Sequence, residues 1–243
     1  MIRSHDRALV LVARPTPAGL DERSLRAFVA AVAERTTGPV RAAYLDHGEP
    51  SIHSALDEVA AAGVDDVLLV PLAVPADRYL VTWMAKAVAN WRATRSHRVE
   101  IRISDGLTTL PAVADAVAAL STAEGRPIAA SPAGFRSPAW SVLEIPERHL
   151  LVRRGPRCTV YGAGATYRAL AEATRGTSTQ VTPTGCVGPC NLGPLVIDHP
   201  DGAWHQHVDP DRAGRLASQV PQPHDRTVDE ATAQSQSSPP PVR

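Results

Sequence analysis

Three cysteines carry the clearest chemical signal in this chain: Cys158, Cys186 and Cys190. Cys186 and Cys190 are separated by three residues in a segment rich in glycine and proline, and no cysteine precedes Cys158. Thiolates are soft ligands for iron, and glycines let backbone N–H groups approach and hydrogen-bond the sulfides of a cluster. An odd number of cysteines argues against a disulfide framework and favours metal or cluster ligation, with buried structural cysteines as the alternative.

A second group of polar residues follows apolar runs in the N-terminal half of the chain. They are Arg14 after the first run, Asp46 and His47 after the second, and Tyr79 beyond the third. Arginine is a fixed cation that pairs with carboxylates, whereas neutral imidazole is both a metal ligand and a base that titrates near pH 7. If the runs are parallel strands, these residues share the edge at which such sheets bind ligands.

Short apolar runs alternate with amphipathic segments along the first 120 residues. The runs that we predict to be strands are 8–13, 40–46, 66–72 and 99–103. The segments that we predict to be helices are 21–35, 50–62, 80–94 and 109–120. Strands and helices in this order form βαβ units with right-handed crossovers, so we expect an α/β fold with a parallel sheet.

A second unit begins near residue 148. Its predicted strands are 149–154, 177–183, 194–198 and 203–208, and its predicted helices are 163–174 and 210–218. We therefore divide the chain into a first domain 1–121, a proline-rich linker 122–147, a second domain 148–220 and a tail 221–243. Phe135 and Trp140 of the linker are expected to pack on a domain surface. The tail lacks an apolar face that would offset its ordering entropy, so we predict it to be disordered.

Charge and hydropathy argue against two classes of partner. The 243 residues include 25 basic and 25 acidic side chains, a balance that offers no basic field to nucleic acid. No apolar run reaches the roughly 18–20 residues that a membrane-spanning helix needs. The apolar stretch near the N-terminus is also too short for the core of a signal peptide. We therefore predict a cytoplasmic protein with neither nucleic acid nor membrane as a partner.

Glycine and proline frame the last two cysteines in a distinctive pattern. It consists of Gly188 to Cys190, Gly193-Pro194 and the segment Pro200 to Trp204. With this pattern, residues 148–220 resemble the thioredoxin-like [2Fe-2S] ferredoxins. The resemblance implies a thioredoxin-like domain that holds a [2Fe-2S] cluster with four thiolates.

The ligand set implied by this resemblance is incomplete, because Arg153 stands where the family has its first cysteine. Cys158, Cys186 and Cys190 are then the implied cluster ligands, and a histidine would replace the fourth thiolate. The histidines in the neighbourhood are His149, His205 and His207. The alternative is that the fold is retained and the cluster is lost, since a guanidinium offers no lone pair to iron.

The N-terminal domain also resembles a known family. Pro50-Ser51 after the second strand and Pro71-Leu72 at the third, with the strand order, are similar to the class II tetrapyrrole chelatases, the sirohydrochlorin cobaltochelatase family. The resemblance implies a flavodoxin-like parallel sheet and a site where two histidines bind the metal and take pyrrole protons. In this chain Arg14 and Tyr79 stand at the two histidine positions, and Asp46 keeps the family's carboxylate.

Two functions follow from these resemblances. The first is a cobaltochelatase-like enzyme that inserts Co²⁺ or a similar ion into an anionic tetrapyrrole, with Asp46 and His47 as catalytic residues. Arg14 and Tyr79 would bind its substrate. The second is a non-catalytic protein that binds a tetrapyrrole or a redox partner and carries a [2Fe-2S] cluster. His53 is a further candidate ligand, although solvent-facing side chains are the simpler interpretation of His47 and His53. Because the family builds its site from two such domains, we expect a homodimer.

Overall fold

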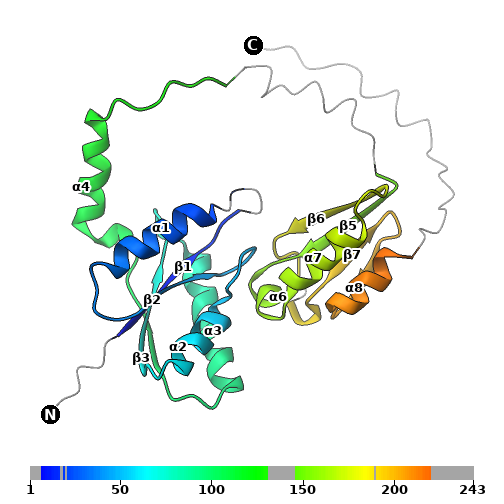
Figure 1. Cartoon of the computed structure of the whole chain (residues 1–243), viewed down its shortest axis with the longest axis horizontal. Helices are drawn as coiled ribbons and strands as arrows, with labels where there is room; N and C mark the ends of the chain where they lie inside the picture. The colour runs from blue at the N-terminus through cyan, green and yellow to red at the C-terminus, as the bar shows by residue number, and fades with distance from the viewer. Residues whose placement is uncertain (1–6, 17–18, 20, 131–145, 189, 220–243) are drawn as a thin grey trace.

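The computed structural model describes residues 7–16, 19, 21–130, 146–188 and 190–219. Two α/β units lie next to each other, the first in blue to green and the second in yellow-green to orange (Figure 1). The strands of the first unit are β1 (Ala8–Ala13), β2 (Val40–Tyr44), β3 (Asp66–Pro71) and β4 (Glu100–Ile103). Its α-helices are α1 (Glu22–Ala33), α2 (Ile52–Ala61), α3 (Arg78–Thr94) and α4 (Pro111–Ala119), and two 3₁₀ turns flank the last, η1 (Leu107–Thr109) and η2 (Leu120–Thr122).

The first unit contains a parallel sheet with strand order β2-β1-β3-β4. All three neighbouring pairs are parallel, and Leu11 of β1 lies between Ala42 of β2 and Val70 of β3. This confirms the predicted flavodoxin-like fold. Right-handed crossovers place α1 on the face opposite α2 and α3. The carboxyl ends of β1, β2 and β3 therefore meet at one edge.

Local capping explains why the helices begin where the sequence predicts. The side chains of Asp21, Ser51 and Asp77 accept hydrogen bonds from backbone N–H groups in the first turns of α1, α2 and α3. Such caps satisfy donors that a helix start leaves open. The core then forms on one face of the sheet, because α2 and α3 bury apolar side chains such as Leu56 and Met84, whereas α1 has no buried residue.

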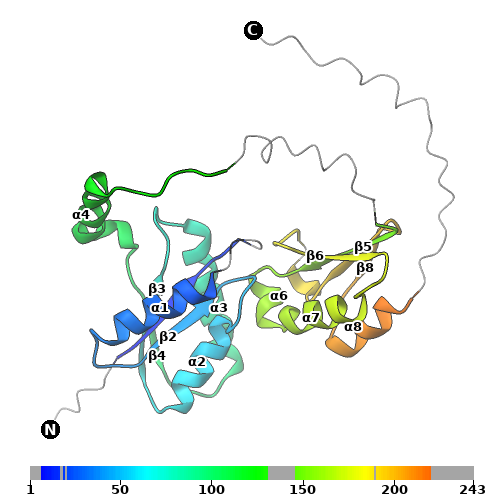
Figure 2. The same cartoon turned by 45° about the horizontal axis from the view of Figure 1, so that its top comes forward.

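Helix α4 stands away from the sheet in both views (Figures 1 and 2). None of its described residues is buried, and the apolar side chains of Leu110, Val117 and Leu120 around it are more than half exposed. No helix in the described ranges is long and apolar enough to span a membrane.

The second unit is built around a mixed sheet with strand order β6-β5-β7-β8. Its strands are β5 (Arg148–Arg153), β6 (Thr179–Thr184), β7 (Val196–His199) and β8 (Ala203–His205). Its helices are α6 (Pro156–Val160), α7 (Ala163–Ala173) and α8 (Pro210–Ala217), with a 3₁₀ turn η4 (Cys190–Leu192). β5 pairs with β6 in parallel, while β7 runs antiparallel to β5 and β8. The predicted thioredoxin-like fold is confirmed.

Helix α6 is the element that the sequence analysis missed. The sequence analysis predicted a strand at 149–154 and a helix at 163–174 with no helix between them, but Cys158 between these two segments lies in α6 and is buried. Pro156 is compatible with the first turn of a helix, and Gly162 separates α6 from α7 with a φ of 86° that suits glycine. The expected packing of Phe135 and Trp140 and the predicted disorder of 221–243 lie outside the described residues.

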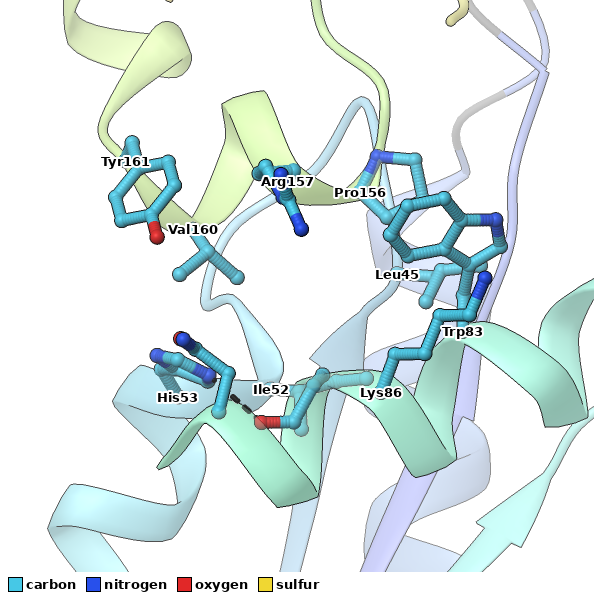
Figure 3. A pocket seen from close by; sticks show the side chains of 11 residues that line it. Leu45, Ile52, His53, Trp83, Lys86, Pro156, Arg157, Val160 and Tyr161 are labelled. Carbon is cyan, nitrogen blue, oxygen red and sulfur yellow. Dashed lines mark hydrogen bonds between the residues drawn. The ribbon is translucent and has the colours of Figure 1, made fainter. Parts of the chain in front are cut away.

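The two units touch where α6 packs against α2 and α3. A small crevice of about 50 Å³ marks this seam, with Ile52 and Trp83 on one side and Pro156 and Val160 on the other (Figure 3). Beside it, the N–H of His47 donates a hydrogen bond to the carbonyl oxygen of Arg154 at 3.2 Å. An ion pair of 3.0 Å between Arg168 and Glu49 adds a second polar contact. The second unit therefore covers the loop that follows β2.

Candidate active site

The four residues predicted for the chelatase site line one cavity of about 400 Å³. Arg14 follows β1, Asp46 and His47 follow β2, and Tyr79 lies in the first turn of α3. The second unit contributes Gly185 and Cys186 to the same wall, which the sequence analysis did not foresee. The cavity lies at the carboxyl edge of the parallel sheet, where such sheets bind ligands.

Asp46 is the most unusual group in this cavity, since only 3% of the residue is exposed. Its Oδ2 atom lies 3.5 Å from Nε of Arg14, while Oδ1 has no hydrogen-bond partner in the described part of the chain. Burial raises the pKa of Asp46 to about 6, although the charge of Arg14 opposes this shift. A carboxylate with this pKa exchanges protons near neutral pH.

His47 is buried beside Asp46, with 7% of the residue exposed. The prediction of a solvent-facing side chain is wrong because the second unit covers it. Burial, followed by the charges of Arg154 and Arg14, lowers the pKa of His47, so its imidazole is neutral at pH 7. Its Nδ1 atom has no hydrogen-bond partner among the residues described. A neutral ring offers a lone pair to a proton or a metal ion.

Arg14 is held in place by three neighbours. Its Nη1 atom donates to Oδ2 of Asp77 at 3.0 Å, Asp46 lies on the Nε side, and the guanidinium lies 4.3 Å from the ring centre of Tyr79. The arginine side chain is nevertheless 41% exposed, so part of the cation faces solvent. The exposed part of the Arg14 guanidinium can therefore form an ion pair with a carboxylate of a ligand, while the ring of Tyr79 supports the guanidinium by a cation–π contact.

A second, more apolar hollow of about 440 Å³ adjoins the cavity and shares Arg14 and Pro15 with it. Helix α1 contributes Leu25 and Phe28, and Tyr44, Leu72, Ala73, Val74 and Leu107 are also among the residues that line it. The sequence analysis missed this surface. Phe28 was the residue that could have indicated this surface. Phe28 is an aromatic residue that is 47% exposed, and it lies on α1, a helix without a buried residue. An apolar hollow beside a fixed cation suits a flat ring that carries carboxylates.

His53 does not reach this cavity. It lies in α2, is buried, and its Nε2 atom is 2.9 Å from the carbonyl oxygen of Ala87, a contact drawn as a dashed line in Figure 3. Burial lowers the pKa of His53. The prediction of a solvent-facing side chain is wrong here too, and His53 belongs to the seam between the units rather than to the rim.

The cysteines lie in different surroundings. Cys158 is buried in α6 and burial raises the pKa of its thiol, whereas Cys186 is exposed at the cavity. The side chain of Cys190 lies outside the described part of the structure. His149 contacts Thr182 through Nε2 at 2.8 Å, and His205 lies 3.7 Å from Asp198.

The ligand set of a [2Fe-2S] cluster is incomplete among the described residues. Among them, no three His, Cys, Asp or Glu side chains form a group that holds a metal ion. The place of the first cysteine is filled by Arg153, whose buried guanidinium donates to Sγ of Cys158 at 3.4 Å. A cation at a ligand position does not fit a cluster that needs an electron pair from each ligand.

The strand order of the first sheet and the cavity at its carboxyl edge agree with the family comparison, which supports a tetrapyrrole chelatase-like protein. The family model of CbiX matches residues 8–124, so this part of the chain is a CbiX chelatase family domain.

Solved and curated proteins resemble each unit. A putative cobalamin (vitamin B12) biosynthesis CbiX protein from Marinobacter aquaeolei is 22% identical, with 49% of this chain and 96% of that chain covered and a TM-score of 0.41. The wild-type thioredoxin-like [2Fe-2S] ferredoxin from Aquifex aeolicus is 28% identical, with 28% and 80% covered and a TM-score of 0.26. A curated 2Fe-2S ferredoxin of Aquifex aeolicus is 47% identical over 34 residues, 14% of this chain, and the match spans 31% of that relative.

Proposed function

We propose that the CbiX domain binds an anionic tetrapyrrole at this edge and inserts a divalent metal ion such as Co²⁺. The observation that carries the proposal is the buried carboxylate of Asp46, which lines the cavity and whose Oδ1 atom has no hydrogen-bond partner among the described residues. A charged group is costly to bury without full hydrogen bonding, so its retention here points to chemistry rather than to stability.

Metal insertion releases two protons from pyrrole nitrogens for each divalent ion that enters the ring. Asp46 has a pKa near neutrality and His47 is a neutral base, so each accepts one proton in this proposal. Arg14 holds a peripheral carboxylate of the macrocycle, and the apolar hollow under α1 takes a face of the ring. Tyr79 keeps Arg14 in position.

A second candidate function is a carrier that binds the tetrapyrrole without metallating it. The observation in its favour is the pair Arg14 and Tyr79, which lie in contact where the family has two metal-binding histidines. Neither side chain is a good ligand for Co²⁺, because the guanidinium stays protonated without a lone pair to donate and a phenol binds such ions less readily than imidazole.

The deciding experiment is anaerobic Co²⁺ insertion into sirohydrochlorin, followed through the visible spectrum of the macrocycle. An enzyme converts the free-base spectrum into the metallated one faster than a protein-free control. A carrier shifts the free-base spectrum on binding and leaves the insertion rate at the control value. No spectral change on mixing would refute both functions.

The affinity for the macrocycle should depend on Arg14. Because its side chain is 41% exposed, we expect Arg14→Ala to cost only about 1 kcal/mol, or about fivefold in the dissociation constant. An absorbance titration with sirohydrochlorin measures this change. Arg98→Ala is the matched control, since this exposed arginine precedes β4 at the opposite edge of the sheet. Equal affinities for both variants and the parent protein would remove Arg14 from the site.

A further inference from the structure

We propose that Arg153 takes the place of the iron–sulfur cluster in the second unit, so that its guanidinium joins the cysteine-bearing segments and the unit folds without iron. This inference concerns the second unit alone and does not depend on metal insertion by the first.

Arg153 is the last residue of β5 and one of the largest fully buried side chains of the chain, with 1% of the residue exposed. Its Nη1 atom donates to the carbonyl oxygen of Gly188 at 2.8 Å, and Nη2 donates to Sγ of Cys158 at 3.4 Å. Gly188 lies between Cys186 and Cys190, in the glycine- and proline-rich loop that carries both cysteines. One guanidinium therefore connects this loop to α6, the connection that a shared cluster makes in a ferredoxin.

The packing around the thiols is close. A Cβ atom at Gly193 would lie 2.4 Å from Sγ of Cys158, and a Cβ atom at Gly155 would lie 2.8 Å from Cβ of Cys186. The thiol of Cys158 is thus enclosed by Arg153 on one side and by the backbone of Gly193 on another. Glycine at both positions lets the segments approach each other without a metal between them.

The chemistry of the groups agrees with this arrangement. A cluster iron needs a lone pair from each ligand, and arginine stays protonated with none to donate. The sulfur of Cys158 instead accepts the hydrogen bond that Nη2 of Arg153 donates.

The second unit has a structural role at the candidate active site that requires no redox centre. Its Arg154 carbonyl accepts the hydrogen bond from the N–H of His47, and Gly185 and Cys186 form part of the cavity wall. The unit therefore forms part of the wall of the candidate active site of the first unit.

The test compares the full chain with its Arg153→Cys variant after anaerobic reconstitution with iron and sulfide. We expect the parent protein to be colourless and folded, with under about 0.2 iron per chain, whereas Arg153→Cys should turn brown with about two irons and two sulfides. Arg154→Cys, one residue further along, is the matched control and should gain no cluster. A brown parent protein with about two irons, or an Arg153→Cys variant with no more iron than Arg154→Cys, would overturn the proposal.

A second measurement covers the case in which Arg153→Cys fails to fold. If the parent protein needs no iron, its thermal midpoint should be the same after chelator treatment and after reconstitution. A midpoint that rises with reconstitution would show that the native unit binds the cluster, and the proposal would fail.

Discussion

Asp46→Asn should slow metal insertion by about 100-fold or more and at the same time stabilise the protein. The asparagine has nearly the same shape but does not accept a pyrrole proton at neutral pH. It also removes a buried negative charge. The pKa of Asp46 rises from 3.8 to about 6 on folding. This rise means that ionisation of the carboxylate lowers the free energy of unfolding by about 2–3 kcal/mol.

The raised pKa of Asp46 makes the free energy of unfolding depend on pH. Because the pKa of Asp46 is higher in the folded state, the folded protein holds more protons than the unfolded chain between about pH 3.8 and 6. The contribution of Asp46 to stability therefore falls as pH rises through this window. The advantage of Asp46→Asn should be near zero at pH 4 and complete above pH 7. Urea unfolding of both proteins at these pH values measures it.

The matched control is Asp105→Asn, since this exposed carboxylate follows β4 at the same edge of the sheet. It should change neither the insertion rate nor the pH dependence of stability. An unchanged insertion rate in Asp46→Asn would show that another group accepts the protons. A stability difference that is the same at pH 4 and pH 8 would show that the carboxylate is not desolvated.

Asp198→Ala should be the most damaging single change in the second unit, with a loss of about 3–5 kcal/mol. The carboxylate of Asp198 and the guanidinium of Arg148 form a buried pair, with Nε of Arg148 at 2.9 and 3.1 Å from the two carboxylate oxygens. Arg148 also donates to the carbonyl oxygens of Leu216 and Gln219 and so ties β5 to the end of α8. Removal of Asp198 leaves the arginine charge buried without its counterion.

Differential scanning calorimetry of the full chain should show a drop of more than about 12 °C in the transition of the second unit. Amide hydrogen exchange in β5 and β7 assigns this transition to the second unit. Glu172→Ala is the control, because Glu172 pairs with Arg175 through the same chemistry at side chains that are 68% and 74% exposed. That change should cost under about 0.5 kcal/mol. Equal effects of both substitutions would mean that the buried pair contributes no more than a surface pair.

Much of the fold is determined locally and could be read from the sequence. The predicted runs 8–13 and 66–72 match β1 and β3 to within one residue, and α1, α2 and α3 begin at side chains that cap them. Arg14 and Asp46 could be assigned to one edge because the order of strands and helices fixes which ends of a parallel sheet meet. Helix α6 was missed because five residues with a proline give too short a pattern to separate a helix from a loop.

Only the tertiary structure decided the state of the groups at that edge. The sequence contains Asp46 and His47, but their burial comes from the groups that pack around them in the folded chain. This burial raises the pKa of Asp46 against the charge of Arg14, and it lowers the pKa of His47 together with the charges of Arg154 and Arg14. The exposure of Cys186 at the cavity and the hydrogen bond of Arg153 to Gly188 likewise join segments that are distant in the sequence. Periodicity and capping act over a few residues, whereas desolvation and charge depend on every group that packs nearby, and the folded chain alone brings those groups together.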